Sequence, residues 1–284
     1  GGRGLPAIPL VRAPRAWLPS AVSGVDLLVD DLEPLLADAD AVVHLAGHNE
    51  TVAARDPSRA IHESLTMTER LVDAATTAGV AKMVFVSTVH VYGRASGPGQ
   101  ILTEDIAPEP TSAYAISRLC CEHVVRAAPF ETVVLRLSNA VGAPVDLDVD
   151  RWTLLASDLS RGAVASGRLT LRTPGLQWRD FVDLGYVGEV VAAAVSPSFA
   201  SGTYNLASGR SCTVRDLAQI IHAAATEIVG RNLVLEMPEP DGEPTAAPTL
   251  SVDRLRSQGV GAPPPVERSI EELVRFCLEH EDRL

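Results

Sequence analysis

The sequence predicts an α/β protein, with a doubly wound parallel sheet and a smaller mixed α/β lobe toward the C-terminus. In the first half of the chain, short β-branched apolar runs alternate with helical periods, which favours parallel strands joined by right-handed helical crossovers. Beyond about residue 143 the pattern loosens into connections that contain proline and glycine, with helices between them. A chain of 284 residues is long enough for both parts.

The composition is that of a compact globular protein, and it excludes several classes of function. Apolar residues make up 46% of the chain and charged residues 21%. The net charge of -12 and the 4% share of aromatic residues argue against a nucleic-acid groove, which needs positive charge and stacking rings. No apolar stretch approaches the length of a membrane span, and the N-terminus lacks the apolar region of a signal peptide. We therefore expect a soluble, cytoplasmic protein.

The cysteines predict neither a disulfide framework nor a metal site. None belongs to a C-x-x-C motif, and two of them are adjacent. We expect no metal, and small buried apolar side chains at Cys120, Cys121, Cys212 and Cys277.

Three apolar runs predict the buried strands of the sheet. They cover residues 41–45, 83–87 and 133–137, and each is too short for a helix. After the first run, Asp56 and Pro57 mark the start of a predicted helix. Gly79 is placed to end this helix in a left-handed cap.

Two later helices are predicted by the spacing of a capping box, in which a hydroxyl and a carboxylate three residues apart satisfy the first N–H groups. The first pair is Thr213 and Asp216, and the second is Ser269 and Glu272. The proline run at 263–265 is expected to be a stiff connector.

The residues that follow the strands carry the candidate chemistry, because ligands of open parallel sheets bind outside the carboxyl ends of the strands. Thr88 follows the run at 83–87 and places a hydroxyl at that edge. Ser112 is a plausible N-cap for a helix that carries Tyr114 and, four residues later, Arg118. Side chains four apart share one helix face, and a fixed cation near a phenol favours the phenolate, the form that accepts a proton.

Six segments, in this order, resemble the extended short-chain dehydrogenase/reductases, the NAD-dependent epimerase/dehydratase group that acts mostly on nucleotide sugars. The segments are 42–47, 85–93, 112–122, 135–142, 179–182 and 204–209. The resemblance runs along nearly the whole chain. It implies a Rossmann-type dinucleotide-binding domain, which we expect to span 1–142 plus about 178–208, and a substrate-binding lobe spanning 143–177 plus 209–284.

The resemblance also implies catalytic roles. Tyr114 would be the catalytic acid/base, and Thr88 the hydroxyl that orients the substrate oxygen. Arg118 stands where the family has the lysine of its Y-x-x-x-K motif, which binds the nicotinamide ribose. Arginine keeps the charge and the donors but is longer and planar, so the exchange is not neutral.

Further residues match positions that contact the cofactor in the family. Asp31 and Leu32 match an acidic and apolar pair that meets the adenine ring, although an Asp before a helix can also be a simple cap. Ala46 and Gly47 match the turn that lines the cofactor. Arg12 stands where NAD-selective relatives place an acid and could pair with a 2′-phosphate, or it could be a surface arginine. We expect NAD or NADP as the cofactor, with NADP slightly favoured.

On the substrate side, Asn139 matches the asparagine that touches the nucleotide diphosphate, and Arg179 the arginine that pairs with its pyrophosphate. The simpler alternative for Arg179 is an ion pair with Asp180. His90 lies in a loop that faces the cleft and is a candidate substrate contact. His44 is expected to be a packing residue that found a hydrogen bond.

These residues imply an NAD(P)-dependent epimerase or ketoreductase that acts on a nucleotide-linked sugar by hydride transfer, and we expect a homodimer. The 4,6-dehydratases of the family follow the catalytic threonine with an Asp-Glu pair, whereas Thr88 is followed by Val89, so no 4,6-dehydratase activity is expected. Two alternatives stay open. One is reduction of a non-sugar carbonyl on the same scaffold, and the other is a catalytically weak protein that binds nucleotides or serves as a scaffold.

The start of the chain departs from the family pattern. The family begins with a strand and a Gly-rich turn that holds the cofactor pyrophosphate, whereas this sequence opens at 1–4 and runs directly into 5–12, which by position is the second strand. We expect the natural protein to carry roughly 25 to 35 further N-terminal residues that supply this unit. The chain as written is expected to bind dinucleotide poorly.

Overall fold

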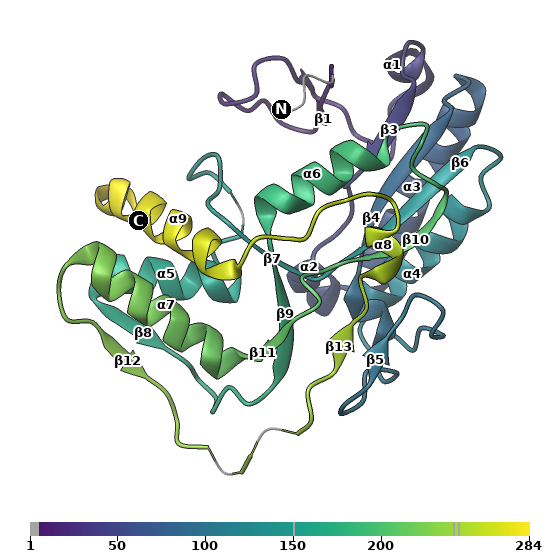
Figure 1. Cartoon of the computed structure of the whole chain (residues 1–284). Helices are drawn as coiled ribbons and strands as arrows, with labels where there is room; N and C mark the ends of the chain where they lie inside the picture. The colour runs from purple at the N-terminus through teal and green to yellow at the C-terminus, as the bar shows by residue number, and fades with distance from the viewer. Residues whose placement is uncertain (1–5, 150, 241, 244) are drawn as a thin grey trace.

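The computed structural model describes residues 6–149, 151–240, 242–243 and 245–284. At its centre is a four-stranded parallel sheet in the order β10-β6-β4-β3, which confirms the predicted α/β class (Figure 1). The strands are β3 (Ala41–His44), β4 (Lys82–Thr88), β6 (Glu131–Leu137) and β10 (Gly202–Leu206). All three predicted strands are therefore present, each within a residue or two of its predicted bounds.

Helices cover both faces of this sheet. Successive residues of a strand point to opposite faces. On β4, Phe85 accordingly joins a buried cluster with α3 (Pro57–Thr77) and α4 (Ala113–Arg126), whereas Val84 joins another with α6 (Leu184–Ala194). The sheet is thus buried between two helical layers, as its apolar strands predict (Figure 1).

The helices that carry the candidate residues begin where the sequence predicts. The Asp56 carboxylate accepts a hydrogen bond from the backbone N–H of Arg59 at 3.1 Å and opens α3, and Gly79, with φ of 73°, follows its end. The Ser112 hydroxyl accepts from the backbone N–H of Ala115 at 3.2 Å and opens α4. Each cap satisfies one of the N–H groups that a helix start leaves without a partner.

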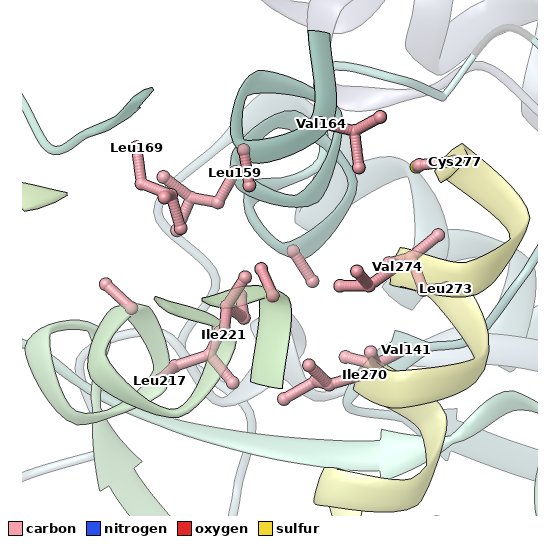
Figure 2. Close-up of a cluster of buried hydrophobic side chains, with 14 of the residues drawn as sticks. Val141, Leu159, Val164, Leu169, Leu217, Ile221, Ile270, Leu273, Val274 and Cys277 are labelled. Atoms are coloured by element: carbon pink, nitrogen blue, oxygen red, sulfur yellow. The ribbon is translucent and has the colours of Figure 1, made fainter. Parts of the chain in front are cut away.

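Outside the main sheet and its helices, the structure is mixed α/β, as predicted for the smaller lobe. This region contains a three-stranded sheet with β9 at the centre, parallel to β7 and antiparallel to β11. Its elements are β7 (Asn139–Val141), α5 (Leu155–Ser166), β8 (Arg168–Thr170), β9 (Trp178–Asp183), β11 (Ser211–Thr213), α7 (Val214–Val229), β12 (Val234–Glu236) and α9 (Val266–Glu279). Figure 2 shows the core where α5, α7 and α9 meet, with Leu159, Ile221 and Leu273 among its buried side chains.

One of the two predicted capping boxes is present, and the other is wrong. Thr213 and Asp216 form a complete box at the start of α7. Ser269 lies inside α9 instead, because the helix begins at Val266, directly after the third proline of the run. A proline before the first turn needs no N–H and has a φ suited to a helix start. The Ser269 hydroxyl donates to the Asp183 carboxylate at 2.7 Å, so it joins α9 to the end of β9.

The start of the chain forms a separate small unit. β1 (Leu10–Val11) and β2 (Val22–Ser23) pair with each other in parallel, and β3 is an edge strand of the main sheet. Doubly wound sheets have the strand order 3-2-1-4-5-6, with the strands numbered along the chain. In this scheme β1 corresponds to strand 2, β2 to strand 3 and β3 to strand 4. No strand among the residues that the structure describes corresponds to strand 1, in agreement with the prediction that this sequence lacks the first strand and its Gly-rich turn.

Short elements complete the described part of the chain: α1 (Glu33–Leu36), α2 (Glu50–Arg55), η1 (Val89–Tyr92), β5 (Ile101–Leu102), β13 (Thr249–Leu250), α8 (Asp253–Arg256) and η2 (Glu281–Arg283). All four cysteines are free. None of the described helices is both long and apolar enough to cross a membrane. The predicted residue bounds of the two domains stay a prediction.

Candidate active site

Tyr114 and Arg118 share one face of α4, as their spacing predicts. Tyr114 lies in the first turn and is half-buried, and Arg118 lies one turn later and is 7% exposed. The guanidinium carbon of Arg118 is 5.7 Å from the centre of the Tyr114 ring and 5.6 Å from the centre of the Phe85 ring. At these distances the cation interacts with the faces of both rings.

The same guanidinium reaches the turn that follows β3. Arg118 Nη1 donates a hydrogen bond to the Ala46 carbonyl at 2.9 Å. Gly47 lies directly beneath it, with φ of 145°, and a Cβ built there would be 2.8 Å from Nη1 and 2.9 Å from the central carbon. The backbone conformation and the close approach of Arg118 both favour glycine at this position. The structure therefore joins the predicted Ala46-Gly47 turn to Arg118.

Arg118 lacks a compensating negative charge. In the described parts of the chain no carboxylate pairs with it, and the Ala46 carbonyl is the one acceptor of its side chain. An ion removed from water without a partner costs folding free energy. A polar or anionic ligand that approaches the remaining N–H groups would lower that cost, which makes this cation a binding group as well as a structural one.

His44 is buried beside Arg118 and stays neutral. Burial, and after it the charge of Arg118, lowers the pKa of His44 to about 3. Its Nε2 is 3.0 Å from the Thr68 hydroxyl, which itself donates to the Ser64 carbonyl at 2.8 Å. The Thr68 oxygen must therefore accept, so Nε2 of His44 carries the proton. This confirms the prediction that His44 is a packing residue with a hydrogen bond.

Thr88 and His90 form the end of β4 and the turn after it. Thr88 is 4% exposed, and its Oγ1 accepts the backbone N–H of His90 at 3.2 Å, which leaves its own proton free to be donated. The His90 ring meets the Tyr114 ring edge-on, with the centroids 6.5 Å apart. Although His90 is exposed, loss of hydration at its ring, followed by the charge of Arg179, lowers its pKa. The imidazole is therefore neutral at pH 7.

Asn139 and Arg179 come together on β7 and β9. Asn139 Nδ2 donates to the Asp180 carbonyl at 2.8 Å, and the exposed Arg179 acts on the pKa of His90. The alternative ion pair between Arg179 and Asp180 is wrong, because Asp180 points into the protein and is 5% exposed. Its carboxylate accepts hydrogen bonds from Ser138 Oγ, Ser208 N, Ser208 Oγ and Arg210 N, at 2.7 to 3.1 Å.

The residues predicted for the adenosine end of the cofactor lie in the first part of the chain. Arg12 Nη2 is 3.4 Å from the Asp26 carboxylate, and the Arg12 side chain is 64% exposed. Asp31 accepts the backbone N–H of Glu33 at 3.3 Å, as a cap would, and Leu32 is buried in the core at 3% exposure. No contact joins these residues to Tyr114 or Arg118 in the part of the chain that is described, and their cofactor roles stay predictions.

A buried charge pair that was not predicted from the sequence lies beneath the site. Glu122 accepts from Ser87 Oγ at 2.6 Å and pairs with Arg136, whose Nη2 is 2.9 Å from Oε2. Two signals were available in the sequence. Arg136 is a charged residue inside an apolar strand, and Glu122 continues the four-residue spacing of Tyr114 and Arg118.

The geometry of the side chains defines this site more clearly than any closed cavity does. Cavities of about 400 and 320 Å³ lie beside α2 and beside the turn after β10, and neither is lined by Thr88, Tyr114 or Arg118. The arrangement around Tyr114 offers a phenol, a hydroxyl donor, a neutral imidazole and two cations at the carboxyl edge of the sheet, where ligands of such folds bind.

Comparison with known proteins identifies relatives. Residues 12–207 match the NAD dependent epimerase/dehydratase family. A dTDP-6-deoxy-L-talose 4-dehydrogenase (NAD(P)(+)) of Kitasatospora kifunensis is 32% identical over 212 residues, 72% of this chain and 63% of that protein. A GDP-6-deoxy-D-mannose reductase of Pseudomonas aeruginosa is 28% identical over 199 residues, 67% of this chain and 64% of that protein. The matched region thus spans slightly less than two thirds of the length of these relatives.

A solved structure has the same fold. The structure of RMD from Pseudomonas aeruginosa complexed with NADPH superposes with a TM-score of 0.74 at 25% identity, and the match covers 91% of this chain and 88% of that one. The family match extends from the turn after β1 to the end of β10 and includes every candidate residue of the site. On these grounds the chain belongs to the NAD-dependent epimerase/dehydratase family of the extended short-chain dehydrogenase/reductases.

Proposed function

We propose that this protein is an NAD(P)-dependent epimerase or ketoreductase of a nucleotide-linked sugar, in which Tyr114 moves the proton of a sugar hydroxyl. One observation carries the proposal. The buried guanidinium of Arg118 lies against Tyr114 and the Ala46 carbonyl, with no carboxylate partner among the described residues and with N–H donors left over. A cation in this setting offers its free donors to a ligand bound beside the Tyr114 ring.

The residues around Arg118 fit the nicotinamide end of a dinucleotide. Gly47 presents bare backbone, and Arg118 has free donors suited to ribose hydroxyls. When bound, the cofactor would supply the two-electron redox chemistry at a sugar carbon. Arg12, Asp31 and Leu32 would meet the adenosine end.

A slight preference for NADP rests on Arg12. Its contact with Asp26 is long and exposed, so a 2′-phosphate could compete for the guanidinium. One relative is named for NAD(P)(+), which covers both cofactors, and another was solved with NADPH.

The substrate would lie between Tyr114 and β9. Thr88 can donate its proton to the reacting oxygen while Tyr114 accepts or returns the hydroxyl proton. His90, neutral and edge-on to Tyr114, would contact the sugar. Asn139 and Arg179 would hold the diphosphate, for which a guanidinium is well suited.

We also propose that the protein is not a 4,6-dehydratase. Elimination of water requires proton-transfer groups beside the sugar in addition to the tyrosine. Val89, which follows Thr88, cannot transfer a proton, and it stands where the dehydratases have an acid.

A substrate panel tests the proposal. The protein is incubated with UDP-, dTDP- and GDP-sugars and either cofactor, and products are followed by absorbance at the reduced nicotinamide band and by mass spectrometry. Cofactor-dependent turnover of one sugar nucleotide is expected. A 4-keto-6-deoxy product would contradict the reaction type, and cofactor binding without turnover of any sugar nucleotide would favour a scaffold.

A further inference from the structure

A buried polar network lies beneath the site and has no part in the proposed proton transfer. Glu122 accepts from Ser87 Oγ at 2.6 Å and from Arg136 Nε and Nη2 at 3.1 and 2.9 Å. The Glu122 side chain is 0% exposed and that of Arg136 is 2% exposed. The pair is a two-pronged contact between α4 and β6, and Ser87 connects it to β4.

The network continues across neighbouring strands toward β10. The guanidinium of Arg136 lies over the ring of Tyr92 at 4.9 Å, and the Tyr92 hydroxyl donates to Asn205 Oδ1 at 2.7 Å. Tyr92 belongs to η1, which also carries His90, and Asn205 lies on β10. One connected set of polar side chains therefore joins α4, β4, β6, η1 and β10.

Stability alone is a poor explanation for this network. Two charges taken out of water lose their hydration, and replacement of such a pair by apolar residues of similar volume is often neutral or stabilising. Arg136 also has one nitrogen, Nη1, that is buried without a hydrogen-bond partner. An unsatisfied buried donor costs free energy, and one that persists needs an explanation.

The position of the network supplies that explanation. Glu122 is the third residue in the series that begins with Tyr114 and Arg118, so the three lie on one face of α4. Ser87 is the residue before Thr88. The two-pronged contact with Arg136 on β6 and the single hydrogen bond from Ser87 on β4 together fix the position of α4 along its axis and its rotation against the end of β4.

We propose that Glu122 and Arg136, acting through Ser87, are positioning residues that hold Tyr114 in register with Thr88 and His90. This inference rests on the proposed function, because register matters only if Tyr114 and Thr88 act on one substrate atom. Proton transfer requires heavy atoms within hydrogen-bond reach, and small misplacements lower rates strongly. The network is thus a geometric device rather than a source of stability.

Two variants and a matched control separate these roles. Ser87→Ala removes the link to β4 and leaves the charge pair. The double variant Glu122→Leu with Arg136→Met replaces the pair by apolar side chains and should unfold within about 4 °C of the wild type. Ser269→Ala is the control, because it removes a buried serine-to-carboxylate hydrogen bond of similar length in α9.

The first readout needs no substrate. The backbone N–H of His90 donates to Thr88 Oγ1, so its hydrogen exchange, followed by NMR with ¹⁵N-labelled histidine, reports the setting of Thr88. Exchange should speed up about tenfold or more in Ser87→Ala and in the double variant, and stay at the wild-type rate in Ser269→Ala. Unchanged exchange in Ser87→Ala overturns the proposal, even if the double variant fails to fold.

The second readout is turnover of whichever sugar nucleotide the panel identifies. We expect kcat to fall about tenfold or more in Ser87→Ala and in the double variant, with KM within about threefold, since only the reacting geometry changes. An equal loss of kcat in Ser269→Ala would overturn the proposal. If the wild type turns over no sugar nucleotide, the proposed function fails by itself, and the exchange of the His90 amide still decides whether the network sets Thr88.

Discussion

Tyr114 and Arg118 lie one helical turn apart, and substitutions can separate their roles. Arg118 contributes charge, hydrogen-bond donors and contact with the Ala46-Gly47 turn. Tyr114 contributes a hydroxyl on a ring that packs against both Arg118 and His90. The loss of one hydroxyl therefore tests proton transfer, and changes at 118 test the cation.

Tyr114→Phe should reduce turnover by at least about 10²-fold while cofactor affinity stays within a few-fold, because the ring still packs and only the proton-transfer group is lost. Tyr204→Phe is the matched control. The Tyr204 hydroxyl donates to the Ala200 carbonyl at 2.8 Å, in contact with neither Thr88 nor Arg118, so its loss should leave kcat intact. Steady-state kinetics of both variants check this, and wild-type turnover in Tyr114→Phe would refute the assignment.

Arg118→Lys should retain or raise activity, since lysine keeps the charge and is the family's residue, whereas Arg118→Ala removes charge and donors together. Turnover and cofactor affinity measured at several pH values compare the two. If the alanine variant performs as well as the wild type, the cation has no part in the function of Tyr114.

His44 should make the free energy of unfolding depend on pH in the acidic range. Its pKa is held near 3 in the folded state, against an ordinary value of 6.5, so below pH 6.5 the unfolded chain binds a proton that the folded chain does not. The free energy of unfolding should thus fall by about 1.4 kcal/mol per pH unit for this one proton as the pH drops from 6.5 toward 3. Urea unfolding at several pH values should show a shallower dependence in His44→Gln, and identical slopes would contradict it.

At the scale of elements, the turn after β3 depends on the absence of a side chain at 47. Gly47→Ala should cost about 1 to 3 kcal/mol of unfolding free energy from backbone strain, and it should also weaken cofactor binding because the new methyl group displaces the Arg118 guanidinium. Gly79→Ala is the control, with φ of 73° and nothing within 4 Å of the added carbon, so it adds strain without a contact. Equal cofactor affinity in the two variants would argue against a role for the Gly47 contact.

Much of the local structure could be predicted because its causes are local. Apolar runs, the caps of α3, α4 and α7, and the four-residue spacing of Tyr114 and Arg118 depend on neighbours in sequence. Contacts between distant segments could not be predicted in this way. The Asp180 side chain points inward toward groups more than 25 residues away in sequence, so the alternative ion pair with Arg179 does not form. The start of α9 at Val266 left the second capping box unformed, and Ser269 donates instead to Asp183, 86 residues away.

At the scale of the whole molecule, Asp180 joins the main sheet to the lobe. Asp180 holds the residue after β6 and the turn between β10 and β11, while Arg179 beside it is exposed. The class of the sheet and its two helical layers followed from the sequence. This junction did not, because its partners come from three separate segments.

Asp180→Asn should lower the free energy of unfolding by about 1 to 3 kcal/mol, since an amide nitrogen then faces hydrogen-bond donors. Arg179→Ala, at the neighbouring position, should leave stability unchanged and raise the KM for a sugar nucleotide. Urea unfolding and kinetics of both variants test the division of roles. A destabilised Arg179→Ala variant or an Asp180→Asn variant as stable as the wild type would contradict the assignment of stability to Asp180 and substrate binding to Arg179.

The opposite orientations of Arg179 and Asp180 also bear on misfolding. Strand residues alternate between faces, so a slip of β9 by one position would turn Arg179 into the protein and Asp180 outward. The misaligned strand would bury a cation among serine hydroxyls and backbone N–H groups, and it would expose a carboxylate where Arg179 is proposed to meet an anionic substrate. The competing alignment is disfavoured at both faces, so the side-chain pattern proposed for substrate binding also favours the correct pairing of β9.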